Sequence, residues 1–413
     1  MTTTLPAAPA AAPPTTRRGR LRLVLTLGAL VALGPLTIDM YLPALPALVD
    51  DLATTSATVQ LTLTGTLAGL ALGQLLVGPL SDSFGRRRPL LVGVSLHVLA
   101  SLLCLVAPNI AVLGGLRVLQ GLGAAAATVV AMAIVRDLFE GRAAATLFAR
   151  LMLVLGVAPV LAPTIGGEVL RFVSWRGVFA VLAAIGLAMV VLAARAVPET
   201  LPPARRRPAE LVATLRTYGG LLRDRVFVGL VVVAGLAMSG MFGYVAGSSF
   251  VFQGQFGLDE QQFGLLFGAG ALFLIGGTQA NAALLGRFEP RVLLPAALAL
   301  ALVADAVLVV VALTGIGGLA GIIAPLWVAL FAGGLAVPNT PALALARHGE
   351  AAGTASAVLG ATQMGVGAVV APLVGVLGND AVAMGAVMAG AAVLALVVLY
   401  AVVRPWTLAD LDA

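Results

Sequence analysis

The 413-residue chain contains no lysine, one cysteine and two histidines, and only 10% of its residues are charged. Without lysine it cannot build the Gly-x-x-x-x-Gly-Lys-Ser/Thr loop that holds the phosphates of ATP. A single cysteine forms no intrachain disulfide, and His-Glu-x-x-His and Gly-x-Ser-x-Gly motifs are missing as well. These absences argue against an ATP-driven machine and against the common enzyme classes, so we expect no catalytic residue, no metal site and no cofactor.

Hydrophobic residues make up 60% of the chain and give it a mean hydropathy of +1.07, which is too apolar for water-soluble domains. About 20 apolar residues cross the hydrocarbon core of a membrane as one helix. Continuous runs of Leu, Ala and Val favour helices over the alternating strands of a membrane barrel. The sequence therefore predicts an all-α membrane protein. Twelve spans are expected, at residues 21–45, 57–80, 89–107, 110–134, 146–169, 174–196, 226–252, 260–283, 290–313, 318–343, 353–377 and 380–403.

All 24 basic residues are arginines, and their distribution predicts the orientation of the spans. With a cytoplasmic amino terminus, 21 of the 24 lie on the cytoplasmic side, leaving Arg171 and Arg176 outside and Arg117 within a span. This asymmetry follows the positive-inside rule. It predicts a multi-pass protein of the cell (inner) membrane with both termini cytoplasmic. The net charge of +6 then reflects topology, and we expect no nucleic-acid partner.

The polar segments divide the chain into two halves. The first residues, rich in Ala, Pro and Thr, predict a disordered tail. Although "RRGRLR" followed by an apolar run resembles a secretory signal, the run is too long and eleven spans follow, so we interpret it as an uncleaved helix. We predict a cytoplasmic tail (1–20), a six-helix half (21–196), a cytoplasmic central loop (197–225), a second six-helix half (226–403) and a cytoplasmic tail (404–413).

Several short segments resemble motifs of the major facilitator superfamily. "GPLSDSFGRRRPL" (78–90) is similar to its loop signature Gly-x-Leu-Ser/Ala-Asp-x-x-Gly-Arg-Arg/Lys, and "RVLQGLGAAAA" (117–127) to its fourth-helix motif. "GVAPVLAPTIGG" (156–167) resembles the fifth-helix motif of its drug:proton antiporters. The further segments "IDMYLPALP", "WRGVF", "PNTPALAL" and "GTASAVLG" resemble the Bcr/CflA group, which includes bicyclomycin and chloramphenicol efflux proteins.

This resemblance implies the major facilitator fold, with twelve transmembrane helices in two six-helix halves. The function that it implies is proton-coupled efflux of small amphipathic drugs, multidrug or chloramphenicol-like, by alternating access. The partners would be protons, the substrate and membrane lipid, and we expect a monomer. The alternative is proton-coupled uptake or export of a metabolite by the same fold. Uptake of sugars or organic anions would call for more cavity charge or more than the three tryptophans present.

The fifth-helix segment contains Pro159, Pro163, Gly166 and Gly167, and two prolines within one turn predict a bend in this helix. The chain departs from the family pattern at two places. Ala162 precedes Pro163 where the motif usually has glycine, and Ser249 stands where many relatives have proline. These departures affect the antiporter assignment from this motif and the contacts expected of the seventh helix.

The loop at 78–90 is expected to act as a gating latch. Asp82 lies at the end of the second span, where helix carbonyls disfavour a carboxylate without a partner. Nearby arginines can supply that partner, while two glycines permit a sharp turn and close backbone contact. The alternative is that the arginines only set topology. The residues of this predicted latch are Gly78, Asp82, Gly85, Arg86, Arg87 and Arg88.

Asp39 and Arg117 are charges placed deep within predicted spans. At 1.5 Å per residue, Asp39 lies roughly 24 Å along the first helix and Arg117 about 10 Å from the other end of the fourth, at similar depth. Buried charges in membranes usually face a cavity or a partner. We predict that the two interact, with Asp39 as proton carrier and Arg117 as electrostatic switch. A static ion pair, or an Asp39 exposed to water near the surface, is the alternative.

Polar and aromatic residues near these charges predict a substrate cavity. Gln120, one turn from Arg117, can donate and accept hydrogen bonds, although a helix-packing bond is the alternative. Asp305 in the ninth span is expected to lie peripherally and to make a structural bond, and His97 and Cys104 to be packed helix residues. The aromatic residues of the seventh span, including Phe242 and Phe250, favour a mixed pocket. The predicted cavity residues are Tyr41, Gln120, Tyr244, Phe252 and Gln253.

Overall fold

The computed structural model describes residues 16–206, 211–348 and 351–408. Across these ranges the chain forms helices and turns without a strand, and twelve helical segments are long and apolar enough to cross a membrane. The predicted all-α architecture with twelve spans is therefore confirmed. Their apolar runs reach the length that a bilayer requires, so each can span it as a single helix.

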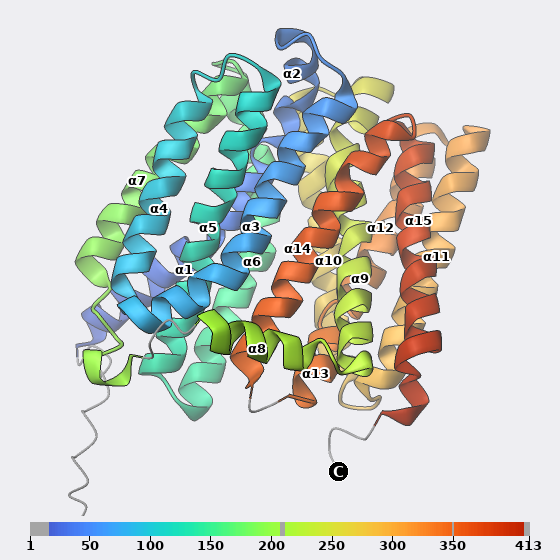
Figure 1. The fold of residues 1–413 in the computed structure, drawn as a ribbon. Coiled ribbons are helices and arrows are strands. Elements are labelled where there is room, and N and C mark those ends of the chain that lie inside the picture. The colour runs from blue at the N-terminus through green and yellow to red at the C-terminus, as the bar shows by residue number, and fades with distance from the viewer. Residues whose placement is uncertain (1–15, 207–210, 349–350, 409–413) are drawn as a thin grey trace, which may run out of the picture.

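The helices form two sets of six (Figure 1). The first set contains α1 (Arg17–Asp39), α3 (Ser56–Phe84), α4 (Arg87–Cys104), α5 (Ile110–Leu138), α6 (Gly141–Leu170) and α7 (Trp175–Ala196). The second contains α9 (Arg225–Ser249), α10 (Glu260–Leu284), α11 (Pro290–Thr314), α12 (Gly318–Ala336), α14 (Ala352–Val376) and α15 (Ala381–Val398).

Shorter elements extend or connect these spans. A 3₁₀ turn (Leu42–Ala44) and α2 (Leu45–Asp51) follow α1, α8 (Leu211–Leu221) joins the two halves, and α13 (Asn339–Ala346) continues α12. A π-helical turn (Phe250–Gln255) ends α9, and another (Leu399–Val403) ends α15. Turns of 3₁₀ helix also occur at Pro203–Arg205 and Pro405–Thr407.

Two segment predictions differ from the structure in detail. Helix α1 begins at Arg17, inside the tail predicted at 1–20, because Thr16 caps its first turn by accepting a hydrogen bond from the Gly19 N–H (3.1 Å). Residues 1–15 lie outside the described ranges. Helix α8 lies within the predicted central loop 197–225 and runs across the lower end of the bundle (Figure 1).

The two halves meet along two pairs of helices. Helix α3 packs on α14, and α6 packs on α10. Within the first half α3 packs tightly on α5: a Cβ at Gly69 would lie 2.8 Å from the Leu122 backbone nitrogen, so only glycine permits this approach. The contact between the halves is made by helices that span the bundle, α3 with α14 and α6 with α10.

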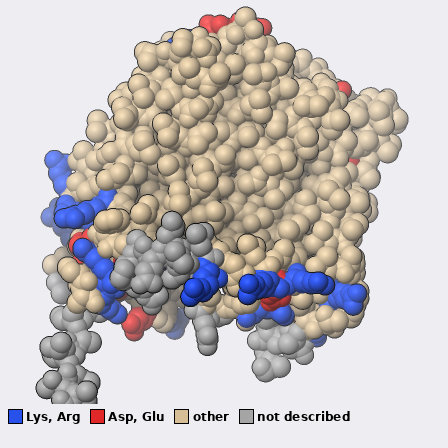
Figure 2. Space-filling model, viewed as in Figure 1, with Lys and Arg blue, Asp and Glu red and all other residues tan. Residues whose placement is uncertain are grey.

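Charged side chains gather at one end of the bundle. Figure 2 shows arginines along the lower edge and an almost entirely uncharged surface above them. This "basic end" carries the α3–α4 and α5–α6 connections and α8, while the "opposite end" carries α2 and the α14–α15 connection. Between the ends, large apolar side chains such as Leu99, Leu153 and Val303 are more than half exposed. An outer surface of this kind is suited to lipid, and the chain is an integral multi-pass membrane protein.

Candidate functional site: a charged helix end and a cavity between the halves

Arg117 of α5 is fully buried inside the first half. Its Nη1 atom donates to the backbone carbonyl of Thr37 (3.0 Å) and to Oε1 of Gln120 (2.5 Å). Its guanidinium carbon lies 4.6 Å from the ring centroid of Tyr41 and 5.6 Å from that of Phe179, which places the cation over two aromatic faces. No carboxylate pairs with Arg117 among the described residues, and its Nε and Nη2 atoms have no hydrogen-bond partner there.

The hydrogen bonds of Arg117 continue into a buried polar cluster formed by Thr37, His97, Ser101, Arg117 and Gln120. Nε2 of Gln120 donates to the Ser101 hydroxyl (2.7 Å), which donates to the His97 carbonyl (2.7 Å). The His97 ring bonds the Thr37 hydroxyl through Nε2 (2.9 Å), and its Nδ1 has no partner in the described chain. His97 is thus part of this cluster, whereas sequence reasoning treated it as packing only.

The predicted ion pair between Asp39 and Arg117 is not formed. Asp39 is 4% exposed, and no hydrogen bond or ion pair joins its carboxylate to any part of the chain that the structure describes. It lies instead within electrostatic reach of Tyr244 in the second half. The depth of a residue along a helix does not determine the side of the helix on which it lies. Asp39 is two residues beyond Thr37, which Arg117 contacts, and is therefore about 200° away from it around the helix.

The predicted cavity residues are packed rather than exposed to a cavity. Tyr41 hydrogen-bonds Thr62 (3.0 Å), Tyr244 stacks on Phe267 with ring centroids 4.8 Å apart, and Phe252 is buried. Gln120 belongs to the polar cluster described above. Gln253 is only partly buried, but its Nε2 reaches the Pro43 carbonyl (3.2 Å) in the first half.

Hydrogen bonds between the two halves close the opposite end of the bundle. Nε2 of Gln60 on α3 donates to the Ala246 carbonyl (3.0 Å) and to Oδ1 of Asn379 (2.8 Å), both in the second half. The Thr64 hydroxyl donates to the Ala368 carbonyl (2.8 Å). The halves are therefore hydrogen-bonded together at this end, with the predicted cavity residues Tyr41, Tyr244, Phe252 and Gln253 packed between or beside them.

The cavity lies at the basic end and has a volume of about 960 Å³. Both halves and α8 contribute to its walls, which combine apolar side chains with hydroxyl and amide groups and with three charged residues, Asp82, Arg86 and Arg136. Representative uncharged residues are Gln74, Thr128, Met132, Phe148, Met152 and Thr354. None of the predicted cavity residues lines it in the conformation described, because Tyr244 is packed against Phe267 and Gln253 bonds to the first half.

Helix α8 forms part of this cavity and connects the halves across it. Tyr218 lines the cavity, and its hydroxyl donates to the Leu75 carbonyl on α3 (3.2 Å). Burial of this hydroxyl raises the pKa of Tyr218. The segment joining the two halves therefore also touches the first half.

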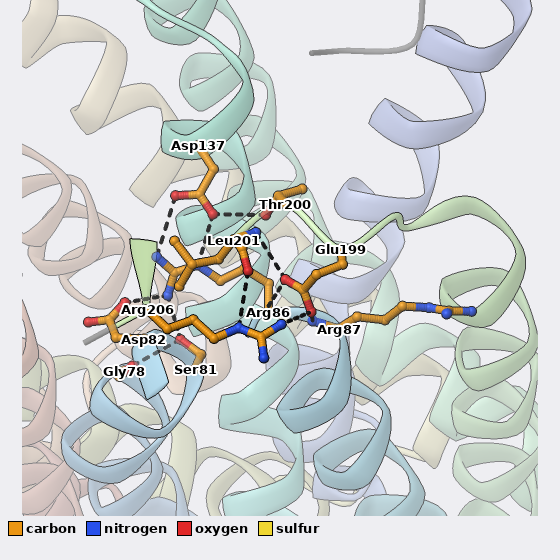
Figure 3. A network of polar contacts seen from close by, with 10 residues as sticks. All are labelled: Gly78, Ser81, Asp82, Arg86, Arg87, Asp137, Glu199, Thr200, Leu201 and Arg206. Atoms are coloured by element: carbon orange, nitrogen blue, oxygen red, sulfur yellow. Dashed lines mark hydrogen bonds and ion pairs between the residues drawn. The ribbon is translucent and has the colours of Figure 1, made fainter. Parts of the chain in front are cut away.

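The predicted latch is centred on Arg86 (Figure 3). Its guanidinium binds Asp82 and donates from Nε to Oδ2 of Asp137 (2.8 Å), while its backbone N–H donates to Glu199 (2.8 Å). Burial by itself would lower the pKa of Arg86, but the hydrogen bonds and charges of Asp137 and Asp82 outweigh this effect and raise it above its usual value. Arg86 thus ties α3 and α5 to the chain that follows α7.

The other residues of the predicted latch have different roles. The Arg87 side chain points away from the network and donates to the Ala194 carbonyl (2.7 Å), while its backbone N–H donates to Glu199 (3.4 Å) (Figure 3). Arg88 is exposed and makes no ion pair within the described residues. Gly85 has φ +86°, a conformation that favours glycine. Gly78 is not needed for close packing, since a Cβ there would meet nothing within 4 Å.

A second ionic cluster at the basic end lies at the start of α9. The Asp224 carboxylate accepts hydrogen bonds from Nε of Arg347 and from the His348 ring (both 3.1 Å) and caps α9 through the N–H groups of Val226 and Phe227. Burial would raise the pKa of Asp224, but these hydrogen bonds, with the charge of Arg347, lower it overall. This cluster joins α9 to the connection between α13 and α14.

The fifth-helix motif lies where α6 packs against helices of both halves. Pro159 and Pro163 are inside the continuous helix α6. A Cβ at Gly166 would lie 2.9 Å from the Met40 carbonyl carbon, and one at Gly167 would lie 3.0 Å from that of Glu260. The two glycines therefore let α6 approach the end of α1 and the start of α10, and the bend predicted from the prolines stays a prediction.

A sequence model of the Major Facilitator Superfamily matches residues 26–372. An uncharacterized MFS-type transporter of Bacillus subtilis, YdgK, is 41% identical over 90% of this chain and 93% of its own length. A bicyclomycin resistance protein homolog of Haemophilus influenzae is 32% identical (91% and 94% covered), and a chloramphenicol resistance protein of Pseudomonas aeruginosa is 34% identical (81% and 79%). These relatives confirm the resemblance to the drug-resistance group.

The fold is also similar to that of a solved transporter. A bacterial homolog of the human lysosomal transporter Spinster, in an inward-facing and occupied conformation, superimposes with a TM-score of 0.71. The alignment covers 95% of this chain and 97% of that protein at 16% identity. At this identity the similarity concerns the fold alone.

Proposed function

Because the chain belongs to the Major Facilitator Superfamily, we propose that it is a proton-coupled exporter of small amphipathic drugs that works by alternating access in the inner membrane. The names of its drug-resistance relatives support the substrate class. The observation that carries the mechanism is the 960 Å³ cavity between the halves at the basic end, while hydrogen bonds between the halves close the other end.

The positive-inside rule indicates which side of the membrane the cavity faces in this conformation. The basic end carries most of the arginines and is therefore the cytoplasmic end, with both termini on that side. The cavity then opens toward the cytoplasm, the side from which an exporter collects its substrate. Its walls combine apolar side chains with hydroxyl and amide groups, and Asp82, Arg86 and Arg136 add charge to them. A mixed lining of this kind suits a compound that is itself amphipathic.

Asp39 is the proposed proton carrier. It lies at the end of α1, buried beside Tyr244 of the second half and without a bonded partner among the described residues. A carboxylate in that position is costly when ionised, so the neutral acid suits this conformation. When the halves rock apart at the opposite end, the same carboxyl would reach the outside water and take up a proton there. The proton would be carried into the present conformation and leave toward the cytoplasm, so that proton entry and drug exit run in opposite directions.

The test is export by the Asp39→Asn variant in proteoliposomes, measured with ethidium and with chloramphenicol under an imposed pH gradient. We expect proton-driven export by the wild type and loss of both drug export and drug-induced proton movement in the variant. Asp50→Asn is the matched control, because Asp50 is exposed and makes no side-chain bond within the described residues. Wild-type proton coupling in Asp39→Asn would contradict the role of Asp39, and inward accumulation would favour uptake.

A further inference from the structure

Asp305 of α11 is a buried carboxylate that the proposed mechanism does not use. It is 3% exposed, its Oδ1 atom has no hydrogen-bond partner, and no ion pair reaches it from the described chain. The expectation from the sequence, a peripheral position with a structural bond, is therefore wrong. Helix α11 packs against α12 and α15, and Asp305 lies on the inner side of α11, within the second half.

The carboxyl group lines a small cavity inside the second half, separate from the one between the halves. Its volume is about 40 Å³, and α9, α10, α11, α12 and α15 all contribute to its walls. Apart from Asp305 the lining consists of Leu, Ala, Gly, Val and Met, with no other titratable or charged side chain. Room for one water molecule requires about 10 to 15 Å³, so the cavity is large enough to bring water to the carboxyl group.

The walls determine which ion this site can take. A metal cation needs several oxygen ligands, and this cavity offers one carboxyl group and aliphatic side chains. An ionised carboxylate without a partner is expensive at such depth. A proton removes the charge with a single oxygen and requires no further ligand. The site therefore fits a proton and excludes larger cations.

The second half also lacks the acid that the first half carries on its first helix. Gly240 lies 201 residues after Asp39, the same offset that relates Gly78 to Gln279 near the end of the second long helix of each half. Gly240 lines the small cavity, and a Cβ added there would meet nothing within 4 Å. The space left at this position is faced by Asp305 from α11.

We propose that Asp305 is a second proton-binding site, so that each half of the transporter holds one carboxyl group that gains and loses a proton during the cycle. The coupling of this site to export rests on the proposed function, whereas proton binding itself does not. An exporter with two such sites exchanges more than one proton for each drug molecule. It therefore responds to the membrane potential even when the drug carries a single positive charge.

Proton binding is tested first without a substrate. Infrared difference spectra of the full-length protein in lipid, recorded across a pH titration, report each protonated carboxyl group through its C=O band. We expect Asp305→Asn and Asp39→Asn each to lose one band and the double variant to lose both. The spectra should be the same in sodium chloride and choline chloride, and a sodium-dependent change at Asp305 would overturn the assignment to a proton.

Coupling is then measured as the number of protons moved for each ethidium exported by the same proteins. Asp305→Asn should lower this number by one and reduce the effect of membrane potential on export. An Asp305→Asn spectrum identical to that of the wild type would refute the proton site. A lost band without any change in the proton count would refute its role in transport. Absence of proton-driven ethidium export in the wild type would instead refute the proposed function while leaving the band assignment standing.

A second variant keeps the inference testable when Asp305→Asn does not insert correctly. Gly240→Ala leaves the carboxyl group in place and puts a methyl group into the cavity without a clash. Displacing water should move the Asp305 C=O band to higher frequency, because the carboxyl group loses a hydrogen-bond partner. A wild-type band position in folded Gly240→Ala would show that this cavity does not surround a protonated Asp305, which would overturn the proposal.

Discussion

Gly85→Ala and Gly78→Ala form a matched pair that tests the latch around Arg86. Gly85 ends α3 with φ +86° and ψ 167°, a region of backbone space that is essentially restricted to glycine. A Cβ at this position would also lie 2.7 Å from Cδ of Glu199 and 2.8 Å from Nη2 of Arg206. Gly78 is in the interior of the same helix, faces the large cavity, and has free space where a methyl group would go.

The expected cost follows from these two environments. Backbone strain at Gly85 contributes about 1 to 3 kcal/mol, and displacing Glu199 from the Arg86 N–H adds about 0.5 to 1.5 kcal/mol. We therefore expect Gly85→Ala to destabilise the latched conformation by about 2 to 4 kcal/mol. At 1.4 kcal/mol for each factor of ten, this shifts the equilibrium away from the latched state by about 30-fold to several hundred-fold. Gly78→Ala should stabilise α3 slightly, by about 0.5 to 1 kcal/mol.

The assay is thermal unfolding in one detergent, together with initial rates of ethidium export at equal amounts of inserted protein. Gly85→Ala should unfold at a lower temperature and export more slowly, while Gly78→Ala should unfold slightly above the wild-type temperature and stay within about twofold of the wild-type rate. Equal behaviour of the two variants would refute the reasoning, because it would mean that neither the conformation of Gly85 nor its contact with Glu199 matters to the latch.

Two further predictions concern the two ends of the bundle. Gln60→Ala removes both hydrogen bonds that Gln60 makes across the closed end, which are worth about 1 to 3 kcal/mol together. A cysteine introduced nearby by Ala57→Cys should therefore react faster with an impermeant maleimide in this variant. An unchanged reaction rate would mean that other contacts keep this end closed. Asp224→Asn should lower the unfolding temperature at pH 7. Because the pKa of Asp224 is lowered in the folded protein, its contribution is present above the unfolded value of about 3.9 and disappears as the pH falls through the folded value. The difference from the wild type should therefore shrink in acid, and a constant difference would contradict the carboxylate's role.

The twelve spans could be predicted because each depends only on its own residues. A run of about 20 apolar side chains has to cross the membrane as a helix whatever its neighbours are. The contact between Asp82 and Arg86 could be predicted for the same reason, since the two residues are four positions apart in one short segment. Asp137 and Glu199, which complete the latch, come from other connections, and no local pattern pairs them with Arg86.

The substrate cavity could not be predicted from aromatic and polar residues alone. Those residues are present as expected, but in this conformation Tyr244 is packed against Phe267, and Gln253 bonds across the closed end. The cavity instead exposes methionines, threonines and a phenylalanine from helix faces near the basic end. Which face is open depends on the position of one half against the other, and a single sequence encodes every state of that movement.

The role of Arg117 follows from the place where α1 ends. Helix α1 stops at Asp39 inside the protein, so its last carbonyl groups lack helical partners, and a free carbonyl is costly in a membrane. Arg117 satisfies the carbonyl of Thr37 and, as a cation, favours the negative end of the helix. The same negative end disfavours an ionised Asp39. Arg117 and Asp39 are thus connected through the end of α1 without an ion pair, and a movement of α1 that frees the Thr37 carbonyl would change the surroundings of both residues in one step.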